Sequence, residues 1–333
     1  MNQPSVAVVI LNWNGCPLLE QFLPSVIQYS PEANIYVADN ASTDDSIVWV
    51  QSNHPEVKII QNTKNWGFAG GYNQALQHVN EPILALVNSD IEVTQHWLKP
   101  ILEQFNTQPQ TAIVQPKILD FKNKSKFEYA GAAGGYIDRF GFPFCRGRMF
   151  DTLEDDYGQY DQTTEIFWAS GACLFIRKEV FEKLGGFDID FFAHQEEIDL
   201  CWRAYNLGYK ATYEPKSTVY HVGGATLQQG HPQKTFLNFR NSLYMLTKNL
   251  PTAQLFPVLF IRLSLDGIAG VQFIFKAQPK HCWAILRSHF WFYLMLIKNC
   301  RKRTGRYTHK YYLTTSIVYQ YFVRQKKHFQ DIF

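Results

Sequence analysis

Cysteine is scarce in this sequence of 333 residues, and the six that occur are dispersed. They include no C-x-x-C pair of the kind that forms zinc and redox sites, so we expect reduced thiols packed in the core. A charged and then apolar leader is also missing, because the first apolar run begins at Val6 and stops at Leu11. This favours a cytoplasmic protein.

Two common phosphate-binding loops are absent as well. The glycine-rich segment 67–71 matches neither G-x-G-x-x-G nor G-x-x-x-x-G-K-[ST], which excludes a Rossmann cofactor loop and a Walker loop. No Lys or Arg occurs in residues 11–15, where a nucleotidyltransferase of similar topology would carry a basic phosphate loop. We also find no nucleic-acid-binding motif and expect no nucleic-acid partner.

Charged residues amount to only 18% of the chain against 46% hydrophobic residues, a composition that excludes disorder. The net charge of +3 conceals an uneven distribution, since residues 251–333 hold 13 Lys or Arg and 2 Asp or Glu. We predict an acidic body over residues 1–245 and a basic, aromatic, helical tail over 246–333. Such asymmetry favours an anionic surface as a partner.

The tail lacks an uninterrupted apolar run long enough to cross a membrane. Charged residues interrupt both apolar stretches, 255–275 and 283–297, where ~20 mostly apolar residues would be needed. Basic residues beside Phe, Trp and Tyr instead favour helices that lie in the interface of an anionic membrane. An oligomer contact or a small helical cap is the alternative.

The first 120 residues alternate β-rich runs with helical periodicity, which predicts parallel strands joined by crossover helices. Loops and hairpins are expected over 119–165, followed by a strand, two helices and a strand that ends at His221. The predicted strands are 6–11, 35–38, 57–61, 83–87 and 174–177, and the main predicted helices are 17–29, 72–79 and 196–207.

Polar residues follow the predicted strands. Asn12, Asp39, Asn65 and Asp90 should therefore converge at the carboxyl edge of the sheet, where open α/β sheets bind ligands. Asp39 can cap the next helix, or it can accept hydrogen bonds from a nucleoside base or ribose.

Two nearby segments have residues that suit a bound ligand: the glycines of one suit a diphosphate, and the acid of the other suits a cation. Gly70 and Gly71 before a helix would let backbone amides approach a diphosphate, with Asn73 directed the same way, although a plain turn also needs glycine. Asp90 after an apolar strand must be solvated, paired or metal-bound, and a short polar turn is the local alternative. His221 can be structural, or it can reach a metal or phosphate.

Three carboxylates open the helix predicted at 196–207. Glu196, Glu197 and Asp199 suit a helix N-terminus, and Asp199 has i,i+4 spacing to Arg203. The functional alternative is that one carboxylate acts as a general base. Glu196 and Glu197 lie about 100° apart around a helix, so they cannot both face one substrate atom.

The ordered set of motifs resembles the family 2 glycosyltransferases of the GT-A fold, particularly the bacterial rhamnosyltransferase-like branch. Each motif is weak alone, whereas their order and spacing over roughly residues 5–245 are specific. The matching segments are 9–15, 37–44, 65–73, 86–90, 170–172, 185–188, 196–203 and 221–225.

This resemblance implies an α/β, Rossmann-like GT-A fold with a mixed, mainly parallel sheet, helices on both faces and a C-terminal α-helical region. It also implies inverting transfer of a sugar, with rhamnose a candidate, from a nucleotide-diphosphate-sugar donor. The acceptor would be a hydroxyl of a cell-surface or lipid-linked glycan at the inner face of the cell membrane, and a homo-oligomer is compatible with it. A non-catalytic nucleotide-sugar-binding protein or scaffold is the alternative.

The resemblance also assigns roles to individual residues. Glu197 stands where the family usually has an Asp base, with Glu196 as the second candidate, and Asp90 with His221 would hold Mg²⁺ or Mn²⁺. Asn88 stands where the family commonly has a further acid. Trp168 and Asp199 are predicted on the acceptor side, and Trp202 is a second tryptophan able to stack on a sugar, although core packing would also explain both tryptophans. The predicted donor-binding residues are Asn12, Asn14, Asp39, Asn65, Gly70, Gly71, Asn73, Asn88 and Ser89.

Overall fold

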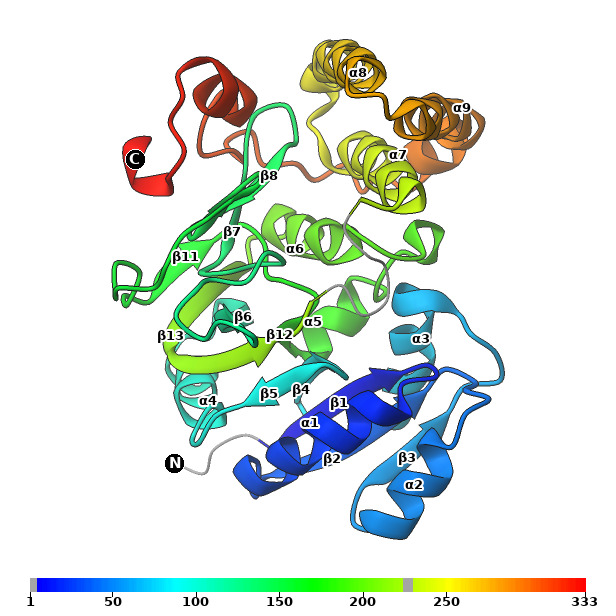
Figure 1. The fold of residues 1–333 in the computed structure, drawn as a ribbon, viewed down its shortest axis with the longest axis vertical. Coiled ribbons are helices and arrows are strands. Elements are labelled where there is room, and N and C mark those ends of the chain that lie inside the picture. Colours follow the sequence, from blue (N-terminus) through cyan, green and yellow to red (C-terminus); the bar gives the residue numbers. More distant parts are fainter. Residues whose placement is uncertain (1–4, 224–229) are drawn as a thin grey trace.

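A computed structural model describes residues 5–223 and 230–333, and its centre is a nine-stranded mixed sheet (Figure 1). The strands of this sheet are β1 (Val6–Asn12), β2 (Ala33–Asp39), β3 (Lys58–Gln61), β4 (Ile83–Asn88), β5 (Ile91–Val93), β6 (Thr111–Asp120), β11 (Thr164–Ile166), β12 (Cys173–Arg177) and β13 (Lys210–His221). Strands β4, β1, β2 and β3 run parallel in that order. Strand β12 lies antiparallel between β4 and β6, so the predicted mixed sheet is confirmed.

Strand β1 is buried on both faces, as its continuous apolar sequence predicts. Val6, Val8 and Ile10 join one hydrophobic cluster, and Ala7 and Val9 join the other. This division follows from the two-residue period of a strand. Polar groups are therefore confined to the strand's end.

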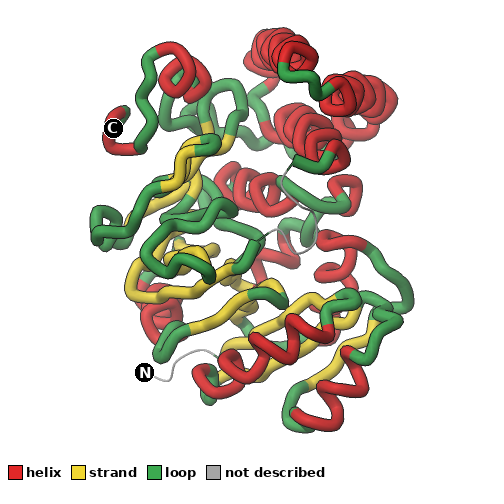
Figure 2. Tube along the Cα trace, viewed as in Figure 1, coloured by secondary structure: helices red, strands yellow, loops and turns green. Residues whose placement is uncertain are grey.

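Helices cover both faces of the sheet (Figure 2). The cluster on the Val8 side includes side chains of α1 (Cys16–Tyr29), α2 (Ser46–Asn53) and α4 (Leu98–Thr107). The cluster on the Val9 side includes side chains of α3 (Gly67–Ala75), α5 (Lys178–Lys183) and α6 (Glu196–Asn206). Short helical turns occupy Leu76–His78, Ile189–Phe191, Tyr319–Val323 and Phe329–Asp331.

The segment predicted as loops and hairpins forms a small second sheet of four strands. These strands are β7 (Gly135–Ile137), β8 (Pro143–Cys145), β9 (Arg148–Met149) and β10 (Thr152–Leu153). The end of the chain packs against this sheet, because Ile317 and Tyr321 share a hydrophobic cluster with Phe144 and Met149. The last residues of the predicted tail are thus bound to the body.

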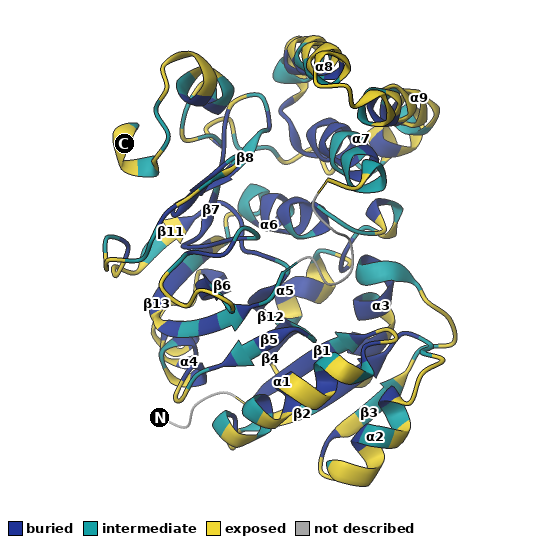
Figure 3. Cartoon of the chain, viewed as in Figure 1, coloured by how far each residue is buried: buried dark blue, intermediate teal, exposed yellow. Residues whose placement is uncertain are grey.

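Three long helices follow β13, namely α7 (Pro232–Asn249), α8 (Thr252–Phe275) and α9 (Pro279–Arg301). They lie side by side above α6 in Figure 1, and α7 runs through the predicted boundary between residues 245 and 246. Exposed residues extend along α8 and α9 in Figure 3. The first helix that lies wholly beyond the predicted boundary is therefore α8, which begins at Thr252.

The charges of α8 face the protein rather than the solvent. Arg262 and Asp266 are buried and paired at 2.8 Å, and His289 of α9 lies 3.3 Å from the second Asp266 oxygen. From the sequence we expected no membrane-spanning helix here, because these charges interrupt the apolar stretch. The structure shows that α8 does have the length and apolar composition to cross a membrane.

Asp199 anchors α6 to α7 and is fully buried. One carboxylate oxygen accepts hydrogen bonds from Arg203 and Lys248, each at 2.8 Å, and the other accepts one from Asn249 at 2.8 Å. Burial would raise the pKa of Asp199, but the positive charges of Lys248 and Arg203 outweigh it and lower the pKa. The prediction of an acceptor-binding role is wrong, because every oxygen of this carboxylate is already engaged within the protein.

We expect Asp199→Asn to lower the free energy of unfolding by about 3–5 kcal/mol, because Arg203 loses its countercharge and buried Lys248 keeps only that of Asp188. Urea unfolding followed by circular dichroism measures the loss. Asp151→Asn changes an exposed carboxylate in the same way and should alter stability little. Equal stability of the two variants would contradict this account of the anchor.

Candidate functional site

The carboxyl ends of β1 and β2 bring two predicted donor residues together. Asn12 lies opposite Asp39 in the strand register, and its Nδ2 donates to Asp39 Oδ1 at 3.3 Å and to Ser42 Oγ at 3.2 Å. Asn12 Oδ1 is buried with no hydrogen-bond partner among the described residues. A buried acceptor of this kind can take a hydrogen bond from a bound ligand.

Asn14 and Ser89 flank the same edge. Asn14 has a left-handed φ of 50°, and its Oδ1 accepts a hydrogen bond from the Thr43 amide at 2.7 Å, which ties the loop after β1 to the loop after β2. A Cβ on Gly15 would come within 2.5 Å of Asn12 Oδ1 and 3.8 Å of Ser89 Oγ. The absence of a side chain at Gly15 thus keeps the space next to Asn12 Oδ1 open.

Asn65 reaches this edge through Asn40, a residue that the sequence analysis did not single out. Asn40 Nδ2 donates to Asn65 Oδ1 at 3.0 Å, and Asn40 Oδ1 accepts from Asn62 and from the Trp66 amide. Asn40 thereby organises the loop between β3 and α3. The only feature of the sequence that pointed to Asn40 is that it directly follows Asp39, the acid at the end of β2.

The expected loop of glycines is part of a helix, because α3 begins at Gly67. A Cβ on Gly71 would lie 2.9 Å from both Asn40 Nδ2 and Leu11 Cδ1, so glycine here allows close packing of α3 on the strand ends. Gly70 occupies the preceding position of the same helix, where a Cβ would lie 2.8 Å from Trp66 Cβ.

Asn73 is not available to a donor. Its Nδ2 donates to the Phe187 carbonyl at 2.7 Å, and its Oδ1 accepts from the Phe187 amide at 2.9 Å. The side-chain amide thus pairs with both backbone polar groups of Phe187, and the predicted donor contact is wrong.

Asp90, His221 and Glu128 form a buried chain of contacts beyond β4. His221 Nε2 lies 3.1 Å from Asp90 Oδ1, and His221 Nδ1 lies 3.2 Å from Glu128 Oε2. Burial alone would lower the pKa of His221, but the contacts with Asp90 and Glu128 raise it to about 10. Glu128 lies in the weakly patterned segment 119–165, and no sequence signal identified it.

Asp90 and His221 can hold a divalent cation only once the imidazole has lost the proton that its raised pKa keeps on it at neutral pH. Two ligand atoms that share one such ion at a right angle lie about 3 Å apart, close to the separation between Asp90 Oδ1 and His221 Nε2. A carboxylate on the far nitrogen, as supplied by Glu128, is the usual way in which a ligating histidine is oriented. No group of three or more His, Cys, Asp or Glu side chains suited to a metal occurs in residues 5–223 and 230–333, and Asn88 adds no charge at the end of β4.

Glu196 and Glu197 open α6 as predicted, and neither carboxyl is fully paired. The Oε2 atoms of both are buried without a hydrogen-bond partner among the described residues. Burial raises the pKa of Glu197 to about 7, and burial together with the charge of Glu197 raises the pKa of Glu196 well above its usual range. A carboxyl that titrates near neutrality suits general acid–base catalysis.

The turn that precedes these acids is held by α7. His194 and Gln195 both have a left-handed φ of 70°, a conformation that costs free energy in residues other than glycine. Asn241 Nδ2 donates to the carbonyls of Phe191, Ala193 and His194 at 3.1, 2.9 and 2.7 Å. Asn241 therefore positions the start of α6. Nothing in the sequence around Asn241 indicated this role.

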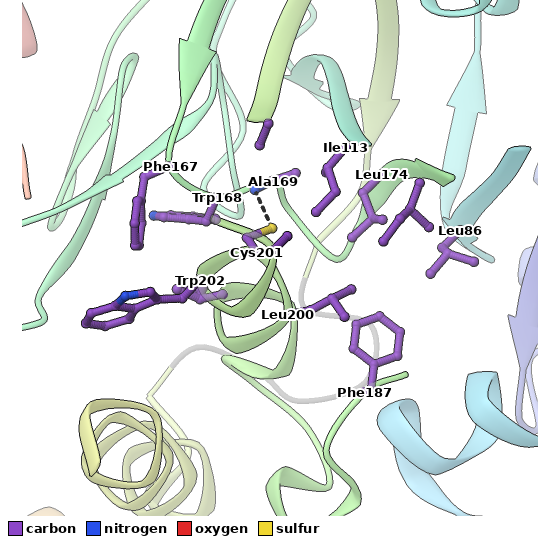
Figure 4. Close-up of a cluster of buried hydrophobic side chains, with 14 of the residues drawn as sticks. Leu86, Ile113, Phe167, Trp168, Ala169, Leu174, Phe187, Leu200, Cys201 and Trp202 are labelled. Atoms are coloured by element: carbon purple, nitrogen blue, oxygen red, sulfur yellow. Dashed lines mark hydrogen bonds between the residues drawn. The ribbon is translucent and has the colours of Figure 1, made fainter. Parts of the chain in front are cut away.

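Both tryptophans assigned to sugar stacking belong to the core (Figure 4). Trp168 Nε1 donates to the Tyr136 carbonyl at 2.8 Å, and its ring lies so close to Gly135 that an added Cβ would come within 2.0 Å. Trp202 is fully buried, with its ring 4.8 Å from that of Tyr311. The prediction that either one stacks on a sugar is wrong, because protein atoms cover the rings.

Known proteins with similar sequences transfer sugars. N-acetylglucosaminyl-diphospho-decaprenol L-rhamnosyltransferase of Mycobacterium tuberculosis is 23% identical over 229 residues, which cover 64% of this chain and 75% of the relative.

Two solved structures share the fold. GalNAc-T7 with UDP, GalNAc and Mn²⁺ matches 75% of this chain and 49% of its own, with a TM-score of 0.58 and 18% identity. The mannosyltransferase PcManGT of Pyrobaculum calidifontis, in complex with GDP-Man and Mn²⁺, matches 90% of this chain and 81% of its own, with a TM-score of 0.54 and 17% identity.

The model of glycosyl transferase family 2 matches residues 7–185, which include the strand ends at Asn12 and Asp39 and the acid at Asp90. This match covers more than half of the chain, and the sheet places those residues at one edge. The chain therefore belongs to glycosyltransferase family 2, has a GT-A fold and is similar to a bacterial rhamnosyltransferase.

Proposed function

We propose that this protein is an inverting glycosyltransferase that moves a sugar, with rhamnose the first candidate, from a nucleotide-diphosphate donor to a hydroxyl of a lipid-linked or surface glycan. The observation that carries the proposal is the pair of buried, incompletely bonded carboxyls at the start of α6. Family membership and the similarity to the mycobacterial L-rhamnosyltransferase support the reaction class and the sugar.

The strand ends would hold the donor. Asp39 and Asn12 are already joined by a hydrogen bond, and the unpartnered Asn12 Oδ1 offers an acceptor to the nucleoside. Asn14, Asn65, Asn88 and Ser89 remain proposed neighbours of the donor. Gly70 and Gly71 would contribute by letting α3 approach this edge.

Glu197 would act as the general base. Its carboxylate would take the proton of the acceptor hydroxyl as that oxygen attacks the anomeric carbon and the bond to the diphosphate breaks. A single displacement inverts the configuration of the sugar. Glu196 is the second candidate for the base.

Asp90 and His221 would hold Mg²⁺ or Mn²⁺, with Glu128 orienting the imidazole. The bound cation would neutralise the charge that develops on the departing diphosphate. Both solved relatives described above contain Mn²⁺, which supports a divalent cation.

Glu197→Gln should lower kcat by about 10²–10⁴-fold, because the amide cannot accept the proton. In the wild type, kcat/KM should rise with pH and level off above about 7, since Glu197 is a carboxylate only above its raised pKa. Release of nucleoside diphosphate measures both effects, with the donor first identified by a thermal-shift screen of nucleotide sugars with and without Mn²⁺. The exposed Glu32→Gln variant is the control, and full transfer by Glu197→Gln would show that another group is the base.

Glu128→Gln should raise the Mn²⁺ concentration needed for half-maximal donor binding by about 10–100-fold, because His221 loses its orienting carboxylate. Asp90→Ala should abolish the Mn²⁺-dependent part of donor binding altogether. Calorimetric titration of the donor at several Mn²⁺ concentrations measures both, with Glu32→Gln again as the control. Identical Mn²⁺ dependence in Asp90→Ala and the wild type would overturn the proposed cation site.

The same protein samples distinguish an enzyme from the alternative, a non-catalytic nucleotide-sugar binder. It would bind the donor saturably in the wild type but release no nucleoside diphosphate, with or without acceptor. Turnover that depends on Asp90 and Glu197 would exclude it.

The α8–α9 pair would place the enzyme on an anionic membrane at the cytoplasmic face. Its outward side chains are apolar, and exposed basic residues such as Lys276 and Lys280 stand beside them. Helices of this kind lie in the interface between headgroups and lipid tails. The large apolar residues exposed on this hairpin are Phe256, Phe260, Ile261, Ile268, Val271, Ile274, Phe275, Trp283, Leu286, Phe290, Trp291, Tyr293, Leu294 and Ile297.

The double variant Phe260→Ser/Phe290→Ser should weaken binding to phosphatidylglycerol vesicles by about 2 kcal/mol, on the order of 30-fold, because both rings are more than 60% exposed and would be buried in lipid. Co-sedimentation measures it, and phosphatidylcholine vesicles should bind less of either protein. Val48→Ser, an exposed apolar position on α2, is the matched control. If the double variant sediments with the vesicles as well as the wild type does, the membrane proposal is wrong. If light scattering gives the double variant half the mass of the wild type, this face is an oligomer contact instead.

A further inference from the structure

The turn that leads into α6 contains a strained aromatic residue. Phe192 has φ 65° and ψ −58°, and across it the Ala193 amide donates to the Phe191 carbonyl at 2.8 Å. This combination is a γ-turn of the rare, strained form. A positive φ of this kind persists in a residue other than glycine only where the surrounding structure imposes it, and such residues gather at functional sites.

Helix α7 imposes this conformation. Asn241 Nδ2 donates to the carbonyls on both sides of Phe192, those of Phe191 and Ala193. Arg240 Nη2 donates to the Phe191 carbonyl as well, at 2.9 Å. Two side chains from a separate helix therefore hold the γ-turn, so its strain is compensated by contacts made outside it.

Core packing does not account for the Phe192 ring, because 51% of the residue is exposed. The ring lies on the backbone of Gly67, where an added Cβ would come within 2.8 Å of the ring atoms Cδ2 and Cε2. Phe150 provides a contrast. It too has a positive φ, of 48°, but its ring packs against those of Tyr321 and Phe322, with ring centres 4.8 and 4.9 Å away. At Phe192 the structure instead holds an aromatic ring toward solvent at a cost in free energy.

The exposed ring is connected to the proposed base through Phe68. The Phe192 carbonyl accepts a hydrogen bond from the Phe68 amide at 3.0 Å. The Phe68 ring and the Glu197 carboxyl carbon both come within 4 Å of the position that a Cβ on Gly171 would take. Ile189, which is 60% exposed, accepts a hydrogen bond from the Phe192 amide and adds a second exposed apolar side chain to the turn. An apolar surface thus leads from the γ-turn toward Glu197.

This surface suits one face of a sugar ring. A pyranose presents C–H groups on its apolar face, and the negative face of an aromatic ring attracts them. Such stacking was predicted for Trp168 and Trp202, which belong to the core. The donor is proposed to bind by its nucleotide at the strand ends, whereas the acceptor must bring its hydroxyl to Glu197. Because the γ-turn leads directly into the helix of Glu197, its position favours the acceptor.

We propose that the Phe192 ring is the platform on which the acceptor sugar rests while its hydroxyl meets Glu197. This inference rests on the proposed function and deepens it, because it names the residue that orients the acceptor. The strained γ-turn fixes where the ring stands relative to the base, so the platform is formed before the acceptor binds.

Saturation-transfer NMR titrations of the full chain with four methyl glycosides, those of glucose, galactose, N-acetylglucosamine and rhamnose, test the inference. Each titration is run with Mn²⁺ and with UDP, GDP or dTDP to fill the donor side. The wild type should bind at least one glycoside, and Phe192→Ala should weaken that binding by about 3–10-fold, the scale of an aromatic contact. Phe192→Tyr should keep the wild-type affinity. Phe150→Ala, which removes a ring from another residue with a positive φ, should leave the affinity unchanged.

The variant Phe192→Gly separates contact from folding. Glycine adopts a positive φ without strain, so this variant should unfold at a temperature at least as high as Phe192→Ala does. It should bind the glycoside as weakly as Phe192→Ala, because both lack the ring. If the glycine variant regains the wild-type affinity, Phe192 only shapes the turn and the inference is wrong.

Wild-type affinity of Phe192→Ala for the glycoside, or binding of none of the four by the wild type, would also overturn the inference. If Phe192→Ala loses affinity for the nucleotide sugar selected by thermal shift but not for the glycoside, the ring contacts the donor and the acceptor assignment is wrong. No sugar is transferred in these titrations. A protein that binds a glycoside through Phe192 but releases no nucleoside diphosphate would refute the proposed function and leave this sugar contact intact.

Discussion

The buried carboxylate of Asp199 joins the parts of the molecule on which the proposed chemistry depends. It accepts hydrogen bonds from Arg203 in its own helix and from Lys248 and Asn249 in α7. Lys248 also reaches Asp188 at 2.6 Å, and Asp188 pairs with Lys302 at the end of α9. A buried charge must be fully paired, so α6, α7 and α9 are held in one arrangement.

The first turn of α6 holds three carboxylates with opposite properties. Asp199 is surrounded by cations, which lower its pKa, whereas Glu196 and Glu197 are buried with unpartnered oxygens, which raises theirs. Environment rather than residue type thus separates a structural acid from a candidate base. The strained turn at His194 and Gln195, fixed by Asn241, sets where the pair lies.

The α8–α9 pair reverses the usual distribution of polar and apolar residues. Its charges Arg262 and Asp266 are buried against the protein, and its phenyl and indole rings face outward. This pattern is stable when the outward face meets an apolar medium or another protein surface. The charged residues Arg262 and Asp266, which argued against a membrane span in the sequence, therefore leave the outward face of the pair apolar.

The sequence by itself determined the family, strands β1 to β4 and β12, and helices α1 and α6, because these depend on local periodicity and on short motifs in fixed order. It also determined that Asn12 and Asp39 would meet, since parallel strands bring their carboxyl ends to one edge. Only the tertiary structure decided which polar side chains remain free. Asn73 pairs with Phe187, Trp168 with Tyr136 and Asp199 with Lys248, all far apart in the chain, and Glu128 becomes the partner of His221. Long-range hydrogen bonds and desolvation set these roles, and neither leaves a periodic trace in the sequence.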